Sequence, residues 1–67
     1  MNLIINGEQL NSTKQTLADI LMEQGISIDT KGVAVALNEQ VITKSKWNET
    51  NLNDNDVIEI VKPFQGG

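Results

Sequence analysis

The chain has 67 residues, 39% of them hydrophobic and 21% charged, which suits one small folded domain with little room for an internal active site. It contains no cysteine and no histidine, which excludes a disulfide framework, a thiolate zinc site and histidine-based acid–base catalysis. The net charge of −4, with five lysines and no arginine, lacks the basic footprint of a nucleic-acid or anionic-membrane binder and favours a basic protein partner.

The N-terminal segment predicts a β-hairpin. The stretch "NLIINGEQLN", residues 2–11, places apolar side chains around Asn6-Gly7, which is the strongest short hairpin signal. The first seven residues have neither a basic n-region nor a long apolar run. We therefore expect no signal peptide, no membrane-spanning helix and a cytoplasmic location.

A helix is predicted after the hairpin, in "TLADILMEQG", residues 16–25. Thr16 can cap its N-terminus with Asp19 three residues on, and Gly25 suits the left-handed residue that follows a helix end. One apolar stripe falls at helical spacing, and we expect it to face a sheet: Leu17, Ile20 and Leu21.

A third strand is predicted in "VAVALN", where larger and smaller apolar groups alternate. We expect the larger set in the core and the smaller set on the opposite face: Val33, Val35 and Leu37 inside, Ala34 and Ala36 outside. A turn near Asn38-Glu39 then leads to a short strand, "QVI".

The last strand is predicted in "VIEIV", residues 57–61. Its alternation places Ile58 and Ile60 inside and Val57, Glu59 and Val61 outside. Asn55, between Asp54 and Asp56, suits a left-handed turn, and the missing ligand spacing of a calcium loop argues against a cation site there.

The order hairpin, helix, strand, short strand, strand predicts an α+β fold in which one main helix covers one face of a mixed sheet of four to five strands. The helix leaves room for parallel pairing of the first and last strands through a right-handed crossover. This is the β-grasp, or ubiquitin-like, arrangement. We expect a domain over residues 1–62 and a flexible C-terminal tail over residues 63–67.

The stretch from Val33 to Gly67 resembles the ThiS family of sulfur carriers in thiamine biosynthesis. The matching features are the "VALN" strand and turn, Trp47 in "KSKW", Leu52 before the "DND" turn, the "IEIV" strand and the final Gly66-Gly67. Two positions depart from the pattern: Lys44 stands where such sequences often have arginine, and Asn55 where the turn is usually glycine.

The resemblance implies a mechanism in which the chain is a substrate of other enzymes. A ThiF-like adenylyltransferase would adenylate the Gly67 carboxylate, a persulfide sulfur would replace AMP, and the thiocarboxylate would supply a ThiG-like thiazole synthase. ATP and Mg²⁺ would belong to the activating partner. We accordingly expect no catalytic residue, metal or cofactor of the chain's own, and a monomer when it is alone.

The tail residues fit entry into a partner's active site: Pro63, Phe64, Gln65, Gly66 and Gly67. Pro63 cannot donate to a ladder and would end the last strand, while glycines without a Cβ can enter a narrow channel. Five extended residues reach about 17 Å. Ordering them costs on the order of 5–10 kcal/mol, so we expect a docking face on the domain.

The predicted docking face is the outer side of the sheet, continued into the tail: Ala34, Ala36, Val57, Val61 and Phe64. Outward β-branched residues also simply favour strands, so a purely structural role for the valines stays open. We expect Trp47 to be structural, packed beneath the last strands.

Three other functions stay open at the level of the sequence. The position of Pro63, shortly before the end of the chain, also resembles the MoaD family, whose members are sulfur carriers of the same fold in the molybdopterin pathway. A ubiquitin-like protein modifier would share adenylation but end in an isopeptide with lysine. A passive β-grasp interaction module would make no use of the tail.

Overall fold

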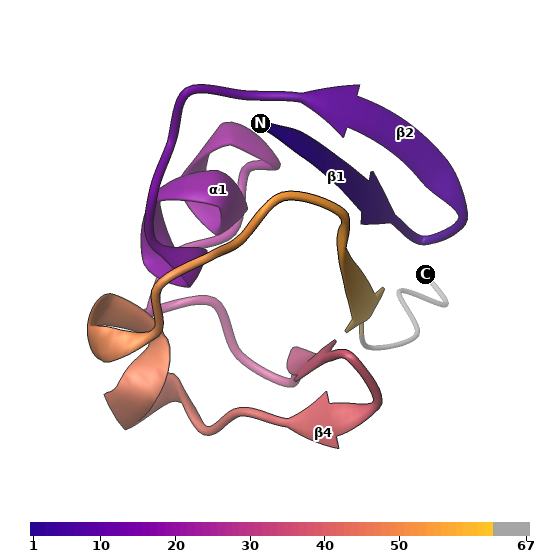
Figure 1. The fold of residues 1–67 in the computed structure, drawn as a ribbon. Coiled ribbons are helices and arrows are strands. Elements are labelled where there is room, and N and C mark those ends of the chain that lie inside the picture. Colours follow the sequence, from indigo (N-terminus) through magenta and orange to yellow (C-terminus); the bar gives the residue numbers. More distant parts are fainter. Residues whose placement is uncertain (63–67) are drawn as a thin grey trace.

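The computed structural model describes residues 1–62, and Figure 1 shows how they are arranged. Five strands, one α-helix and one 3₁₀ helix follow each other along this part of the chain. In chain order they are β1 (Asn2–Ile5), β2 (Glu8–Asn11), α1 (Leu17–Glu23), β3 (Ala34–Leu37), β4 (Gln40–Val41), η1 (Lys44–Glu49) and β5 (Asp56–Val61).

The strands form one mixed sheet in the order β2-β1-β5-β3-β4, with the last strand in the middle. β1 pairs with β2 antiparallel and with β5 parallel, and β3 pairs antiparallel with both β5 and β4. The parallel pairing of the first and last strands, with α1 in the connection, confirms the predicted β-grasp arrangement.

The turns form where the sequence offers residues that tolerate a left-handed backbone. Asn6 and Gly7 join β1 to β2 with φ of 49° and 83°, and Asn38 and Glu39 join β3 to β4 with φ of 50° and 71°. Asn55, before β5, has a φ of 71°. Asparagine and glycine tolerate this region best, so the three predicted turns are confirmed.

Helix α1 begins and ends as its sequence predicts. The Thr16 hydroxyl oxygen accepts a hydrogen bond of 3.2 Å from the backbone N–H of Asp19, which caps the first turn. Gly25, with a φ of 81°, lies just past the helix end. The predicted apolar stripe is fully buried against the sheet: Leu17, Ile20 and Leu21.

The connection between β4 and β5, which contains η1, also contributes side chains to the core. Trp47 on η1 is buried, and its indole Nε1 donates a hydrogen bond of 3.0 Å to the carbonyl oxygen of Ile42. This confirms the structural role predicted for Trp47. Among residues 1–62, the buried apolar set is Leu3, Ile5, Leu17, Ile20, Leu21, Ile26, Val35, Trp47, Leu52, Ile58 and Ile60. Within residues 1–62, no helix is long and apolar enough to cross a membrane.

Candidate functional site

The side of the sheet that faces away from α1 is the candidate site, and β5 runs through its middle (Figure 1). Side chains alternate along this strand: Ile58 and Ile60 are buried in the core, whereas Glu59 and Val61 are exposed. Helix α1 packs on the core side only, so no helix of residues 1–62 covers the outer side of the sheet.

The strand register brings the described residues of the predicted docking face together. Ala34 on β3 lies opposite Val61 on β5, and the next outward position of β3, Ala36, lies opposite Glu59. Val57 lies two residues before Glu59 on the same side of β5. Val61 keeps 64% of its surface exposed, which is far more than a core valine would.

Two further apolar residues on this side were not identified from the sequence. Ile4 on β1 lies opposite Val57, and Val41 on β4 lies opposite Ala36 with 70% of its surface exposed. The alternation of buried Leu3 and Ile5 around Ile4 was the signal that could have found the first of them. We call the complete set the outer apolar face: Ile4, Ala34, Ala36, Val41, Val57 and Val61.

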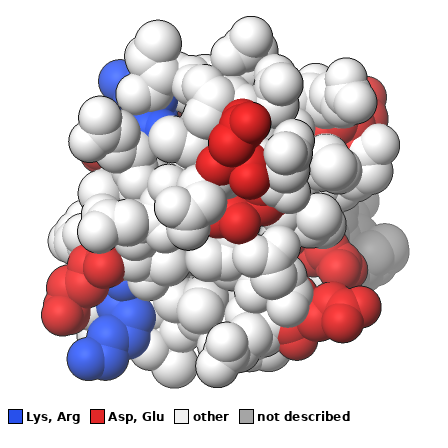
Figure 2. Space-filling view, viewed as in Figure 1, with Lys and Arg blue, Asp and Glu red and all other residues white. Residues whose placement is uncertain are grey.

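Acidic groups accompany the outer apolar face. Glu59 lies on it, and Glu39 lies in the adjoining β3–β4 turn with its backbone in the left-handed region. Together with Asn38 and Val57, the two glutamates line an open hollow of about 290 Å³. Figure 2 shows red acidic side chains on the right, in the centre and at the lower left of the view, whereas the visible blue lysines all lie on the left.

Two asparagine side chains hydrogen-bond to the backbone of β5, one near each end. The Oδ1 of Asn38 accepts from the backbone N–H of Val57 at 2.9 Å, and its Nδ2 donates to the Asp56 carboxylate at 3.0 Å. The Oδ1 of Asn6 accepts from the backbone N–H of Ile60 at 2.8 Å, and its Nδ2 donates to the Ile60 carbonyl oxygen at 3.3 Å. From the sequence, both asparagines are predicted to form turns, but their hydrogen bonds to β5 are not predicted.

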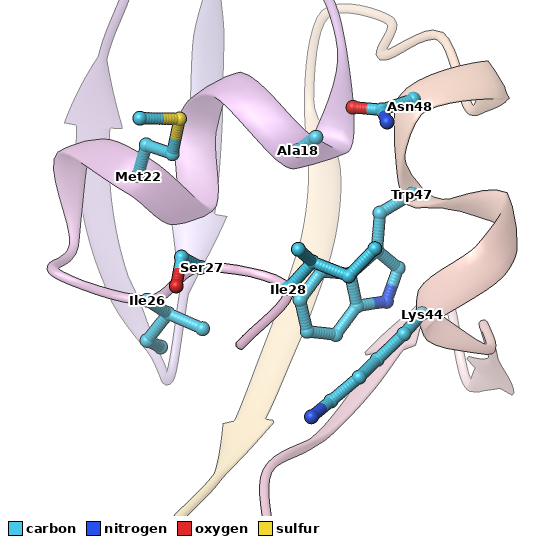
Figure 3. A pocket seen from close by; sticks show the side chains of 8 residues that line it. All are labelled: Ala18, Met22, Ile26, Ser27, Ile28, Lys44, Trp47 and Asn48. Carbon is cyan, nitrogen blue, oxygen red and sulfur yellow. The ribbon is translucent and has the colours of Figure 1, made fainter. Parts of the chain in front are cut away.

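A second hollow, of about 120 Å³, lies between α1, the segment that follows it and η1 (Figure 3). Its walls include Met22 of α1, Ile28 and the indole of Trp47. The one ionisable side chain in its lining, Lys44, donates to the carbonyl oxygen of Thr30. This hollow therefore has apolar walls and no paired acid and base with which to carry out a reaction.

The predicted tail lies outside the described residues: Pro63, Phe64, Gln65, Gly66 and Gly67. The described chain reaches Lys62, one residue after the end of β5. In residues 1–62 there is no group of three or more His, Cys, Asp or Glu side chains that could hold a metal ion. The predicted docking face lies on the described chain and includes Val61, which is followed by the last described residue, Lys62.

Comparison with known proteins gives one family. The model of the ThiS family matches residues 3–67. Over 63 residues, the chain is 40% identical to the sulfur carrier protein ThiS of Thermus thermophilus, a match that covers 94% of this chain and 95% of that protein.

A longer relative also contains this sequence pattern. A thiazole synthase of Paramagnetospirillum magneticum is 40% identical over 68 residues, which cover 100% of this chain and 20% of that protein. The chain therefore spans only a fifth of this relative's length. Among solved structures, the crystal structure of the thiamine biosynthesis protein (ThiS) from Geobacter metallireducens superposes with a TM-score of 0.79 at 24% identity, with both chains covered completely, which shows the shared fold.

Proposed function

This chain belongs to the ThiS family of sulfur carriers in thiamine biosynthesis, and on that premise we propose that the carboxylate of Gly67 is the group that carries the sulfur. The observation that carries the proposal is the extent of the family match, which runs from residue 3 to residue 67 and so includes both final glycines. In this proposal the chain is a protein substrate that partner enzymes modify and use.

The proposed chemistry activates a carboxylate, which is a poor electrophile at neutral pH. A ThiF-like enzyme would join it to AMP from ATP, with release of pyrophosphate and with Mg²⁺ held on the nucleotide in the partner. The terminal sulfur of a persulfide would then displace AMP, and a thiol would cleave the resulting sulfur–sulfur bond to leave the thiocarboxylate. The carrier has no cysteine or histidine, so the sulfur nucleophiles and histidine-type acid–base groups would come from partners.

We propose that partners dock on the outer apolar face and take up residues 63–67 from its edge. Val61 belongs to this face and lies two residues before Pro63, so a partner that covers Val61 also lies beside the start of the tail. The apolar contact would offset the free energy that ordering the tail costs, which is on the order of 5–10 kcal/mol for five residues. Phe64 is the tail residue proposed to continue the contact.

Glu59 and Glu39 suggest that the partner surface that contacts the carrier is positively charged. They stand on and beside the outer apolar face, and the whole chain carries a net charge of −4. A partner with lysine or arginine opposite the two glutamates would associate faster at low salt and would exclude acidic competitors. We therefore propose a basic rim around an apolar patch on the activating enzyme.

A thiazole synthase is the proposed acceptor of the sulfur. The support is that a protein named thiazole synthase contains a segment 40% identical to this chain, so that a carrier-like segment and a thiazole synthase occur in one polypeptide. We propose a ThiG-like enzyme as the partner that receives the sulfur from this chain. A cytoplasmic location stays a prediction.

The proposal is tested by the intact mass of the chain after incubation with a ThiF-like enzyme, ATP and a persulfide donor. We expect the mass to rise by the difference between one sulfur and one oxygen atom, and the product to support thiazole formation by a ThiG-like enzyme. A matched chain without Gly67 is the control and should keep its mass.

The same experiment separates the other functions. Conjugates of higher mass would show a protein modifier, and an unchanged mass with an enzyme that modifies a related carrier would contradict the proposal. The family match and the Thermus thermophilus relative favour thiamine biosynthesis over the molybdopterin pathway that Pro63 left open. Failure of the thiocarboxylate form to support thiazole formation would overturn this choice.

A further inference from the structure

The last three residues of β5, 59–61, extend beyond the end of its pairing with β1. The parallel ladder between β1 and β5 ends where Ile5 lies opposite Ile58, because the chain turns back at Asn6 into β2. The backbone N–H of Asn6 still donates to the carbonyl oxygen of Ile58 at 2.9 Å. β5 continues to Val61, so the backbone of Ile60 has no residue of β1 opposite it.

The side chain of Asn6 takes the place of the missing peptide group. Its Oδ1 accepts from the N–H of Ile60 at 2.8 Å, and its Nδ2 donates to the Ile60 carbonyl at 3.3 Å. A carboxamide has the same donor and acceptor as a peptide, which lets it extend a ladder beyond the point where the backbone leaves it. The turn that carries Asn6 lies on the same side of the molecule as the end of β5 (Figure 1).

We propose that Asn6 is a positioning residue for the activation of the carrier: it fixes the place and direction in which the chain leaves the sheet after Val61. The proposal rests on the proposed function, in which the residues beyond Lys62 enter a partner's active site. On the other side of β5, Val61 lies opposite Ala34 of β3. Asn6 therefore hydrogen-bonds one edge of β5 at Ile60, and β3 pairs with the other edge as far as Val61.

Loss of the Asn6 side chain should weaken the binding of the carrier to its partner. Without the carboxamide, Ile60 and Val61 would be held from the β3 side alone, and a partner would have to order them as well as the tail. Ordering one residue's backbone weakens binding by roughly tenfold, so a partial loss should raise the KM for the carrier by about five- to tenfold. The turnover number at saturation should stay the same, because the reacting carboxylate is unchanged.

The test compares variants of the whole chain in ATP–pyrophosphate exchange with the ThiF-like enzyme. Asn6→Gly removes the carboxamide and tolerates the φ of 49°, so it introduces no backbone strain. Asn6→Asp keeps an oxygen that accepts from the Ile60 N–H but replaces the donor to the Ile60 carbonyl with a second oxygen, so its KM should lie between those of Asn6→Gly and the natural chain. Gly25→Ala is the stability control, because it strains a residue with a φ of 81° at the far end of α1, where an added Cβ would meet nothing within 4 Å.

Amide hydrogen exchange provides a readout that does not depend on the partner. In Asn6→Gly the N–H of Ile60 should exchange at least about tenfold faster relative to that of Ile58, whereas Gly25→Ala should leave their ratio unchanged. A higher KM in Asn6→Gly together with unchanged exchange at Ile60 would mean direct contact with the partner and would overturn the positioning role. An equal KM in Asn6→Gly and Gly25→Ala would overturn it too.

The two proposals can fail separately. If the natural chain itself supports no ATP–pyrophosphate exchange with an enzyme active on a related carrier, the proposed function fails, and the functional role of Asn6 fails with it. If the natural chain is active and Asn6→Gly has the same KM as the control Gly25→Ala, the proposed function stands and the role of Asn6 is wrong.

Discussion

Replacement of Val61 by aspartate is the sharpest test of the outer apolar face. Val61 is 64% exposed, so about two thirds of its surface is available to a partner. Complete burial of a valine stabilises by about 1.5–3 kcal/mol, and the available part therefore contributes about 1–2 kcal/mol. A carboxylate without a partner in the same contact costs at least about 1–3 kcal/mol more, so the KM for the carrier should rise by about 30-fold or more.

The assay is ATP–pyrophosphate exchange against the concentration of the carrier, with Met22→Asp as the control. Met22 lies on α1, away from the outer apolar face, and is 66% exposed, so both variants place one aspartate at an equally exposed apolar site. Urea denaturation should show that both remain folded, because neither site belongs to the core. Normal exchange with Val61→Asp, or an equal loss with Met22→Asp, would refute the assignment of the face.

Three further predictions concern the core, the β5 strand and the tail. Trp47→Ala should lower the free energy of unfolding by about 3–5 kcal/mol in urea denaturation, and Trp47→Phe by less, although the carbonyl of Ile42 loses its donor. Asn38→Gly should cost about 0.5–1.5 kcal/mol in the same assay, because the exposed N–H of Val57 exchanges its side-chain acceptor for water while the left-handed backbone is kept. Deletion of Gly67 should abolish the gain of sulfur seen by intact mass.

The fold followed from short-range signals in the sequence because each of them has a local physical cause. The Asn6-Gly7 pair forms a turn with both residues at positive φ, and Thr16 caps α1 through its own hydroxyl. Within the connection between β4 and β5, the segment Lys44–Glu49 carries no such signal. Its 3₁₀ helix is held by Trp47, whose burial depends on residues distant in sequence, so composition alone could not specify it.

The candidate site could be predicted only in part, because the register between strands decides which residues of different strands lie side by side on the surface. Alternation along one strand shows which side Val57 and Val61 occupy, and the structure agrees. Which residues of other strands stand beside them depends on pairing across the sheet, and this is how Ile4 and Val41 join the face. The hydrogen bonds from Asn6 to Ile60 join residues 54 positions apart, and no local pattern encodes them.

The position of β5 explains how a chain without cysteine or histidine can take part in sulfur chemistry. Ile58 and Ile60 pack into the core on one side of the strand, and Val57 and Val61, which we propose contact a partner, lie on the other side. The same strand leads directly into the tail. In the proposed function, a partner that binds Val61 on β5 also fixes the position of Lys62, so it needs to order only what lies beyond that residue. This is how we propose that the Gly67 carboxylate reaches sulfur nucleophiles and acid–base groups supplied by partner enzymes.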